Sequence, residues 1–382
     1  MSGKKFDFKA LAQMDVKDLF KKRPSTEAKV KVKKAKPMLK PVVSFDFGSE
    51  SIKVVEGRYV REQLQVMRCF SVPTPAGAIE DGRFVNVGLL VNELSKALSD
   101  EGVKAKDAIG CLNSTQIINR ELLIPVVAPE EMETVVRYEI QQFLPINLSD
   151  YLIQYVVLGE VEMMGEKRLK LNVITFPEKM ARAYYDLFKE LGLKPYALDV
   201  SYNAIGKLAH HEKLIEKVTT VEGTVAFVDM GAQSIDLNIF TDGNVQFTRL
   251  IKSGGAIIDE KFNQLPELSI KSAVSFKQQA DLSEEDQGNL SLRIIKLSMD
   301  EMLYELERVL QFYRNKSVGN QIDHLYVLGG LSHLKGLEPY MEARLNVSVS
   351  KIKDIDVTDS NELLNDEVMG DYANALGAMI RL

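Results

Sequence analysis

The hydrophobic residues of this chain follow two spacings that alternate along its length. Short apolar runs with a period of two residues predict strands, and a period of three to four residues predicts helices with one buried face. Strand–turn–strand units are expected at 42–54 and 225–239, single strands at 108–112, 152–157, 169–175, 196–200, 246–251 and 325–328, and helices at 87–98, 130–143, 179–191, 204–209, 254–262, 336–345 and 372–380. This regular alternation predicts an α/β protein.

The pattern Asp-x-Gly-x-x-Ser-Ile occurs in the turn of each strand–turn–strand unit. The first copy starts at Asp46 and contains Gly48, and the second starts 183 positions later at Asp229 and contains Gly231. Glycine lets the turn adopt a positive φ and lets backbone amides approach a ligand, while aspartate can hold a hydrated divalent cation. Two such turns facing each other are predicted to grip a nucleotide's phosphates and magnesium ion.

Two glycine pairs follow strands in the second half of the chain. One is Gly254-Gly255, and the other begins the sequence Gly329-Gly330-Leu331-Ser332. A strand that ends in such a pair before a helix presents free amides at the positive end of the helix dipole, which suits an anionic or polar ligand. One pair alone usually marks an ordinary turn. The order of two matched turns and then a glycine-pair loop is what favours a ligand site.

The composition is that of a globular protein, with 45% hydrophobic and 27% charged residues among 382. This length predicts two or three domains. No run approaches the roughly 18 consecutive apolar residues of a membrane-spanning helix, and the first residues predict no secretory signal. Cys69 and Cys111 make no disulfide framework and suit a reducing cytosol.

The charge is distributed unevenly. Residues 1–40 hold thirteen Lys or Arg against four acids, a net charge of +9, so the overall charge of −6 leaves −15 for the remainder. Such a basic arm is interpreted first as a solvated, flexible extension. The alternative is contact with an acidic partner or with anionic lipid, which attracts basic residues by about 1 kcal/mol per charge near a membrane. No nucleic-acid partner is expected.

Other common site types lack their motifs. The chain contains no Gly-x-x-x-x-Gly-Lys-Ser/Thr loop, no Gly-x-Gly-x-x-Gly turn and no Gly-x-Ser-x-Gly elbow. The four histidines, His210, His211, His324 and His333, show no spacing that suits zinc.

Taken in order, the motifs resemble those of the ATPase superfamily that contains actin, sugar kinases and heat-shock chaperones. Residues 46–53 are similar to its first phosphate motif, 229–235 to its second, and 329–336 to its adenosine motif. The helices with Ala204 and with Gly377 resemble the two connecting helices at the hinge, where small side chains let helices approach closely.

Within this superfamily the chain resembles most closely the PilM family of type IV pilus assembly, and next the FtsA family of cell division. The resemblance covers roughly 41–382 and rests on 177–199, on Asp150-Tyr151 and on the sequence Tyr138-Glu139-Ile140-Gln141-Gln142-Phe143-Leu144-Pro145. It implies an actin-like, duplicated ribonuclease H-like fold of two lobes with an inserted subdomain. The first lobe would hold 41–76, 166–210 and 371–382, the insertion 77–165 and the second lobe 221–370, with 1–40 as the basic arm.

The resemblance also implies ATP with Mg²⁺ between the lobes. Asp46 and Asp229 would hold the cation through water, and Lys53 would meet a phosphate oxygen. The implied nucleotide-binding residues are Asp46, Gly48, Ser49, Ser51, Lys53, Asp229, Gly231, Ser234, Gly254, Gly255, Lys277, Gly329, Gly330 and Ser332. Ser51 and Ser234 could instead cap their turns, and Lys53 could be a solvated strand residue.

One position departs from the family pattern Ala-Glu-x-x-Lys, whose glutamate contacts ribose. This chain has Val274 there, before Lys277. A valine accepts no hydrogen bond from a hydroxyl group, so weaker nucleotide affinity is expected.

Three functions remain open at this stage. The resemblance favours a cytoplasmic ATP-binding scaffold at the inner face of the cell membrane, with weak or no ATPase activity. It would hold the N-terminal cytoplasmic tail of a PilN-like inner-membrane protein, and pilus motor ATPases are further candidate partners. A small-molecule kinase is the second possibility, with Asp199 as the only candidate base. A membrane-tethered filament protein similar to FtsA is the third, although such chains continue into an amphipathic terminal helix and this sequence ends at Leu382.

Overall fold

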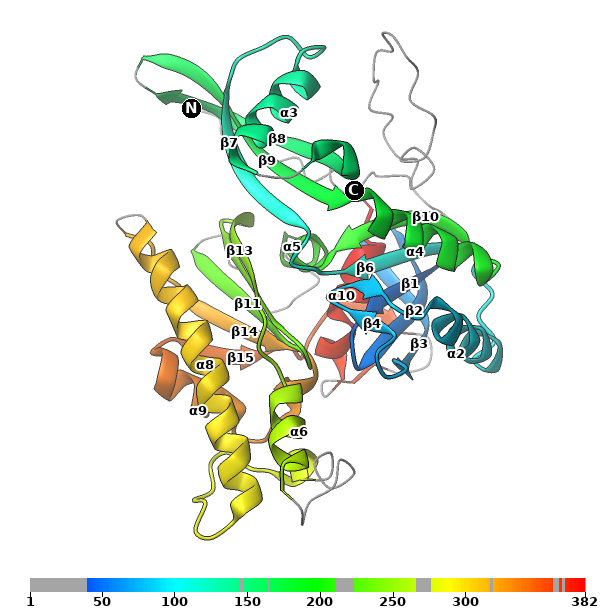
Figure 1. Ribbon diagram of the computed structural model, residues 1–382, viewed down its shortest axis with the longest axis vertical. Coiled ribbons are helices and arrows are strands. Elements are labelled where there is room, and N and C mark those ends of the chain that lie inside the picture. The colour runs from blue at the N-terminus through cyan, green and yellow to red at the C-terminus, as the bar shows by residue number, and fades with distance from the viewer. Residues whose placement is uncertain are drawn as a thin grey trace.

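The computed structural model describes residues 40–144, 147–163, 165–210, 223–265, 276–316, 319–359, 364–365 and 368–381. These residues form two sheet-containing lobes and a smaller unit that extends from the first lobe (Figure 1). The basic arm, apart from Lys40, lies outside the described residues, as do Pro145 and Val274.

A six-stranded sheet forms the first lobe, in the order β10-β6-β1-β2-β3-β16. Its strands are β1 (Val42–Phe47), β2 (Ser51–Val60), β3 (Gln63–Pro73), β6 (Asp107–Leu112), β10 (Lys194–Val200) and β16 (Val357–Asp359). Because β1 pairs antiparallel with β2 and parallel with β6, the chain leaves β1 through a tight turn and returns beside it after a helical crossover. If the strands of this sheet other than β16 are numbered by their order in the chain, their order across the sheet is third, second, first, fourth and fifth.

Alternating residues of β1 pack on opposite faces of this sheet, as the period of a strand requires. Val43, Phe45 and Phe47 share a core with helices α2 (Val87–Asp100) and α4 (Glu178–Glu190). Val42 belongs to a second core, formed with helices α5 (Ser201–His210) and α10 (Ala373–Met379). A short hairpin, β4 (Ile79–Glu80) and β5 (Arg83–Phe84), precedes α2.

The second lobe repeats the arrangement of the first. Its five-stranded sheet has the order β13-β12-β11-β14-β15, which is again third, second, first, fourth, fifth. The strands are β11 (Thr224–Met230), β12 (Ile235–Thr241), β13 (Asn244–Ile251), β14 (His324–Leu328) and β15 (Ser348–Lys351). The duplicated motif in the sequence therefore reflects a duplicated sheet.

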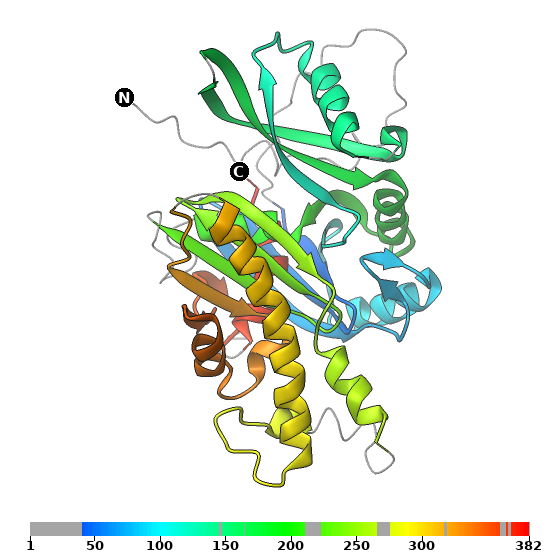
Figure 2. The same ribbon diagram turned by 60° about the vertical axis from the view of Figure 1, so that its left-hand side comes forward.

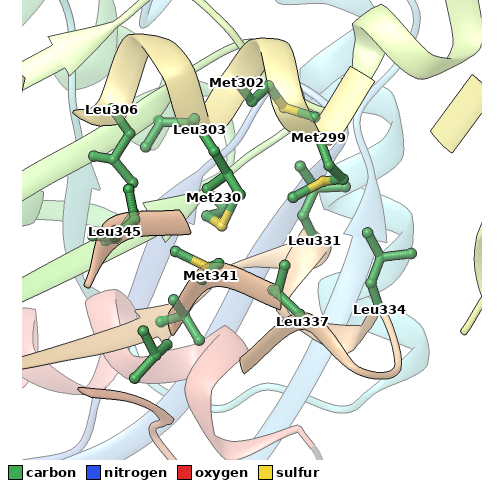
Figure 3. Close-up of a cluster of buried hydrophobic side chains, with 14 of the residues drawn as sticks. Met230, Met299, Met302, Leu303, Leu306, Leu331, Leu334, Leu337, Met341 and Leu345 are labelled. Carbon is green, nitrogen blue, oxygen red and sulfur yellow. The ribbon is translucent and has the colours of Figure 1, made fainter. Parts of the chain in front are cut away.

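The helices of this second lobe that the structure describes are α6 (Ala256–Asn263), α8 (Leu290–Lys316) and α9 (Leu337–Leu345). Figure 3 shows how α8 directs Met299, Met302 and Leu303 toward Met341 of α9 and toward Met230 at the end of β11. In the described part of the chain, no helix is both long enough and apolar enough to cross a membrane.

One hydrophobic core joins the two lobes. It contains residues of both sheets, such as Ile109 and Phe227, together with α5 and α10. The two helices approach very closely, since a Cβ atom at Gly377 would lie 2.2 Å from the Ala204 carbonyl oxygen. The small residues expected at a hinge between lobes therefore do permit close helix packing.

The smaller unit consists of a three-stranded sheet in the order β7-β9-β8, with helix α3 on one face. Its elements are β7 (Ile118–Pro125), α3 (Met132–Phe143), a 3₁₀ turn η2 (Leu148–Asp150), β8 (Tyr151–Met163) and β9 (Glu166–Pro177). The expected insertion at 77–165 is therefore displaced at both ends. Strand β6 belongs to the first lobe, between β1 and β10, and β9 pairs with both other strands of the insertion. Strand β16, expected in the second lobe, pairs with β3 of the first.

Candidate functional site

A cavity of about 810 Å³ lies between the two lobes. The turn after β1 and the turn after β11 both contribute to its wall. All the residues implied by the resemblance line it except two, Gly254 and Ser332. The two copies of the motif thus line the same cavity, although most of the first lobe and the insertion lie between them in the sequence.

The two turns have the same backbone arrangement. Gly48 and Gly231 are packed against the carbonyl oxygen three residues later, and a Cβ atom would lie 2.6 Å from that of Ser51 or 3.1 Å from that of Ser234. In the second turn the Gly231 N–H also donates to the Ser234 carbonyl oxygen at 3.0 Å. A Cβ atom at Gly48 would collide with its own turn and one at Gly231 would be crowded, which favours glycine at both positions. Neither glycine has the positive φ that the motif predicts, so close packing is the reason for glycine here.

The strands that flank the turns place different residues opposite the two aspartates. Asp46 pairs with Lys53 across β1 and β2, whereas Asp229 pairs with Asp236 across β11 and β12. Asp236 also lines the cavity, and the motif analysis did not identify it. The two turns are therefore similar in backbone but differ in charge, since the second lobe has an additional carboxylate opposite its motif aspartate.

Asn374 of α10 connects the two aspartates. Its Nδ2 atom donates to a carboxylate oxygen of Asp229 at 2.8 Å and to one of Asp46 at 3.3 Å. Asn374 is buried, and its Oδ1 atom has no hydrogen-bond partner among the described residues. A helix from the C-terminal end of the chain therefore holds the motif aspartates of both lobes at the bottom of one cavity.

Burial makes the ionised form of these carboxylates unfavourable. It raises the pKa of Asp46 to about 7, with the negative charge of Asp229 as the next cause. Burial and the same charge raise the pKa of Asp236 to about 7, and burial also raises the pKa of Asp229. A divalent cation at this position would favour the ionised forms and offset that cost.

The residues present fit a hydrated magnesium ion. Both carboxylate oxygens of Asp236 and the Oδ1 atom of Asn374 lack a well-formed hydrogen bond within the described chain, although Asn113 and Asn238 lie near enough to Asp236 to lower its pKa. Buried polar atoms of this kind are normally satisfied by water or ligand. Among the described residues, no group of three or more Asp, Glu, His or Cys is arranged to bind a metal ion directly. The donor set therefore fits a cation that keeps its water ligands, as Mg²⁺ commonly does.

The glycine pair at 254–255 does not have the role that the sequence predicts. The N–H groups of Gly255 and Ala256 donate to the carbonyl oxygens of Gly231 and Ala232, at 3.0 and 2.8 Å. These amides are consequently unavailable to a ligand. A Cβ atom at Gly254 would lie 2.5 Å from the Ala232 oxygen. The glycine pair therefore packs against the backbone of the second turn and supports it.

The second glycine pair does line the cavity, but Ser332 does not. Ser332 is buried, and its N–H donates to the Gly329 carbonyl oxygen at 2.9 Å. Gly329 has a φ of +84°, and a Cβ atom there would lie 2.3 Å from Oδ1 of Asp229, whereas Gly330 has no atom within 4 Å of such a position. The lack of a side chain at Gly329 therefore lets the loop pass close to Asp229. The lack of one at Gly330 leaves space in the cavity.

Both lysines expected at the site line the cavity, and each already has a polar contact. Lys53 donates to Oγ of Ser71 at 3.2 Å. Lys277 forms an ion pair with Asp259 of α6 at 2.7 Å. Asp259 was not predicted, because nothing in its local sequence indicates that α6 would bring it to Lys277.

The hairpin β4–β5 of the first lobe reaches the cavity wall facing the second lobe. Its Asp81 accepts a hydrogen bond from the Thr115 N–H at 2.8 Å and lies 3.7 Å from the Lys252 ammonium group of the second lobe. Asp81 and Lys252 both line the cavity. This ion pair is an additional contact between the lobes that the sequence patterns did not reveal.

Asp199, the candidate base of a kinase, is not positioned for that role. It is buried, is absent from the cavity lining and forms an ion pair with the buried Lys207 at 2.5 Å. Asn203 and the Val200 N–H also donate to it, at 2.7 and 2.9 Å. Lys207 further donates to the Ile380 carbonyl oxygen at 3.0 Å, so this pair anchors the end of α10 to α5.

Two lobes with the same sheet topology, whose Asp-x-Gly turns meet at one cavity, define the actin-like class of α/β proteins. The predicted fold class is thus confirmed by both topology and comparison. The chain belongs to the family of the type IV pilus assembly protein PilM, whose model matches residues 44–377. The family predicted from the motifs is therefore correct.

Two solved structures support this fold, and a third with a lower TM-score is also similar to the chain. A structure described as the "PilM-PilN type IV pilus biogenesis complex" is 21% identical, with a TM-score of 0.75 over 89% of this chain and 98% of that one. The ethanolamine utilization protein EutJ from Carboxydothermus hydrogenoformans is 13% identical, with a TM-score of 0.50 over 90% of each chain. MreB 5 of Spiroplasma citri, in a structure bound to AMPPNP, is 12% identical with a TM-score of 0.49, over 88% of this chain and 96% of that one.

Proposed function

We propose that this protein is a nucleotide-loaded scaffold of type IV pilus assembly, which binds ATP with Mg²⁺ between its lobes and holds the cytoplasmic tail of a PilN-like membrane protein. The observation that carries the nucleotide site is the contact of Asn374 with both motif aspartates at the bottom of the cavity. Family membership carries the pilus function. In this account the nucleotide serves mainly to hold the two lobes together.

The turns after β1 and β11 would bind the phosphates from opposite sides. The amides and hydroxyls near Gly48 and Gly231 are the donors, and Lys53 supplies a positive charge from the cavity wall. Asp46 and Asp229 would hold the hydrated Mg²⁺, whose chemical contribution is to neutralise the phosphate and carboxylate charges that meet there.

Weak or absent turnover is supported by the contacts of three other acids of the cavity, whose lining also includes Glu50 and Glu80. Asp81 is bound to Thr115, Asp259 to Lys277, and Asp371 to His333 at 2.9 Å. Acids that are already engaged are poorly placed to activate a water molecule. If hydrolysis occurs, Asp236 is the candidate base, because its oxygens lack a well-formed hydrogen bond within the described chain and its pKa is raised to about 7.

The insertion would bind the membrane partner's tail by strand addition. Strand β7 lies at the edge of the three-stranded sheet, next to the passage from β6 into the insertion. An edge strand offers backbone donors and acceptors to an extended peptide, and neighbouring side chains select its sequence. The exposed Leu123 of β7 is the apolar residue on this edge that such a peptide would contact.

Peptide binding tests this function directly. A synthetic peptide with the N-terminal cytoplasmic sequence of a PilN-like inner-membrane protein should bind the intact protein in a fluorescence anisotropy titration, and a scrambled peptide should not. Leu123→Glu should weaken binding, while Val157→Glu, an exposed residue on the opposite edge strand β8, should not. No binding by the parent protein would exclude the tail as a ligand, and equal effects of the two variants would exclude the β7 edge.

The proposed location is the cytoplasmic side of the cell membrane, where the tail of such a partner would lie. The net charge of +9 in residues 1–40 supports additional contact with anionic lipid headgroups. Pilus motor ATPases are further candidate partners of the scaffold. Sedimentation of polymers with ATP and lipid would instead favour a filament related to FtsA, and phosphoryl transfer to a sugar would favour a kinase.

A further inference from the structure

The outer face of helix α8 carries an exposed apolar stripe. Leu290, Leu297, Tyr304 and Phe312 are exposed to 54%, 51%, 62% and 62%. The opposite face of the same helix fills the core of the second lobe (Figure 3), and Figure 2 shows α8 along the outside of that lobe. The helix is thus apolar on two faces, although only one of them is covered.

The spacing of these residues forms a continuous surface. Leu290, Leu297 and Tyr304 are each seven residues apart, and seven residues of an α-helix fall only about 20° short of two full turns. Their side chains therefore lie in nearly one row along the helix. Exposed apolar residues scattered singly are common, but a row of them on one helix is typical of a surface that pairs with another helix.

We propose that this face of α8 pairs with α8 of a second copy of the chain, in an antiparallel arrangement with the two-fold axis at Leu297. In this register Leu297 faces its own equivalent, and Leu290 faces Tyr304 of the other copy. Arg293 then faces Glu301 of the other copy, and the same contact recurs on the other side of the axis. This alignment matches three of the four apolar residues and one pair of opposite charges, while Phe312 lies beyond the helical contact, because α8 begins at Leu290.

Charge complementarity selects this alignment over the others. A parallel pairing in register would place Arg293 against Arg293 and Glu301 against Glu301, which is repulsive. An antiparallel pairing centred between residues 300 and 301 would place Arg293 against Arg308. An axis at Tyr304 would place Leu297 against Gln311 and leave Leu290 unmatched.

The charged residues of this alignment make other contacts in the monomer, and those contacts do not prevent the pairing of the two α8 helices. The ion pair of Glu301 with Lys261 of α6, at 2.7 Å, uses only its Oε1 atom. Arg308 is exposed and paired with Glu305 on its own helix. Farther from the axis, Arg308 would point toward the start of the other α8, where the exposed Glu284, Glu285 and Asp286 precede the helix.

The contact is isologous, so it closes into a dimer and does not propagate into a filament. One helix face from each copy buries much less than the roughly 1,600 Å² of a standard stable interface. A dissociation constant in the micromolar range is therefore expected. Two copies held side by side at a membrane would reach the local concentration that such an affinity requires. This inference does not depend on nucleotide or on peptide binding.

Cross-linking at the axis gives the most specific test. In the full-length protein, Leu297→Cys should form a covalent dimer with a short bis-maleimide, because the two cysteines would face each other. Val85→Cys, equally exposed but on the first lobe, is the matched control, and the parent protein reports any reaction of Cys69 and Cys111. No more dimer with Leu297→Cys than with Val85→Cys would overturn the proposal.

Charge exchange tests the register. Arg293→Glu and Glu301→Arg should each weaken self-association in sedimentation equilibrium by about ten-fold, since each variant places like charges together twice per dimer. The double variant should restore the parent affinity, and unchanged thermal unfolding midpoints would show that all variants fold. Failure of the double variant to recover, or a parent protein that stays monomeric at all concentrations, would contradict the pairing and leave this face to a different protein.

Discussion

Asp46 and Asp229 accept hydrogen bonds from the same amide nitrogen, that of Asn374. The two aspartates begin the two copies of the repeated motif, and Asn374 lies on a third segment of the chain. Nucleotide site and lobe arrangement are consequently coupled, because a movement that separates the lobes would lengthen at least one of these hydrogen bonds. A ligand that binds both turns would stabilise the arrangement with the hydrogen bonds formed.

Replacing Asn374 should loosen this junction. Asn374→Ala removes a buried donor shared by two carboxylates, so the free energy of unfolding without ligand should fall by about 1–3 kcal/mol. Urea unfolding followed by circular dichroism measures the change. The control is Gln233→Ala, a residue that lines the same cavity outside this contact. Equal stability of both variants would show that the Asn374 contacts contribute little.

The raised pKa values predict an unusual pH dependence for the protein without Mg²⁺. Because the pKa of Asp46 and of Asp236 is about 7 in the folded state and about 4 when unfolded, the folded state binds more protons between these values. Stability should therefore fall as the pH rises from about 4 to about 7, by a few kcal/mol. Urea midpoints across this range test the sign.

Two controls identify the groups responsible for that pH dependence. Asp236→Asn should flatten the dependence, since the amide does not ionise. Magnesium with ATP should flatten it as well, because a cation favours the ionised carboxylates. Stability that rises steadily with pH in the parent protein would be incompatible with protonated carboxyl groups at this site.

The adjacent residues Gly329 and Gly330 allow two alanine variants to be compared in the loop after β14. Gly329→Ala should destabilise the protein by about 1–3 kcal/mol, because its φ is +84° and the added Cβ would collide with the Asp229 carboxylate. Gly330→Ala should leave stability nearly unchanged, since open space surrounds that position. Thermal unfolding of the two variants measures the difference, and similar losses in both would show that the loop relaxes.

Much of this fold could be predicted from local patterns. The strand–turn–strand units and the helix that became α3 follow directly from apolar periodicity and turn residues. Helix α8 was not predicted, because apolar residues on both its buried face and its outer stripe hide the helical period. The predicted bounds of the insertion differ from the structure for another reason. Strand β6 joins the first sheet by pairing with β1 and β10, and its own sequence does not indicate this pairing.

The site was predictable to the extent that its chemistry lies in contiguous motifs. The residues of the two turns, including Asp46 and Asp229, are local and were found. Asn374 and Asp236 were missed because only tertiary structure brings them to the cavity, although a lone polar residue in a helix of small apolar residues is a usable signal for Asn374. The amides at Gly255 were misjudged because the neighbouring turn already binds them.

The central claim is that both turns bind one nucleotide, and isothermal titration calorimetry with Mg²⁺ and ATP tests it most directly. The account predicts binding at one site per chain in the parent protein, and a loss of at least about ten-fold in affinity in both Asp46→Ala and Asp229→Ala, since each removes a carboxylate that holds the cation. Val157→Ala, an exposed residue of the insertion that does not line this cavity, should bind as the parent does. No heat of binding in the parent, or unchanged affinity in either aspartate variant, would contradict a site shared by the two lobes.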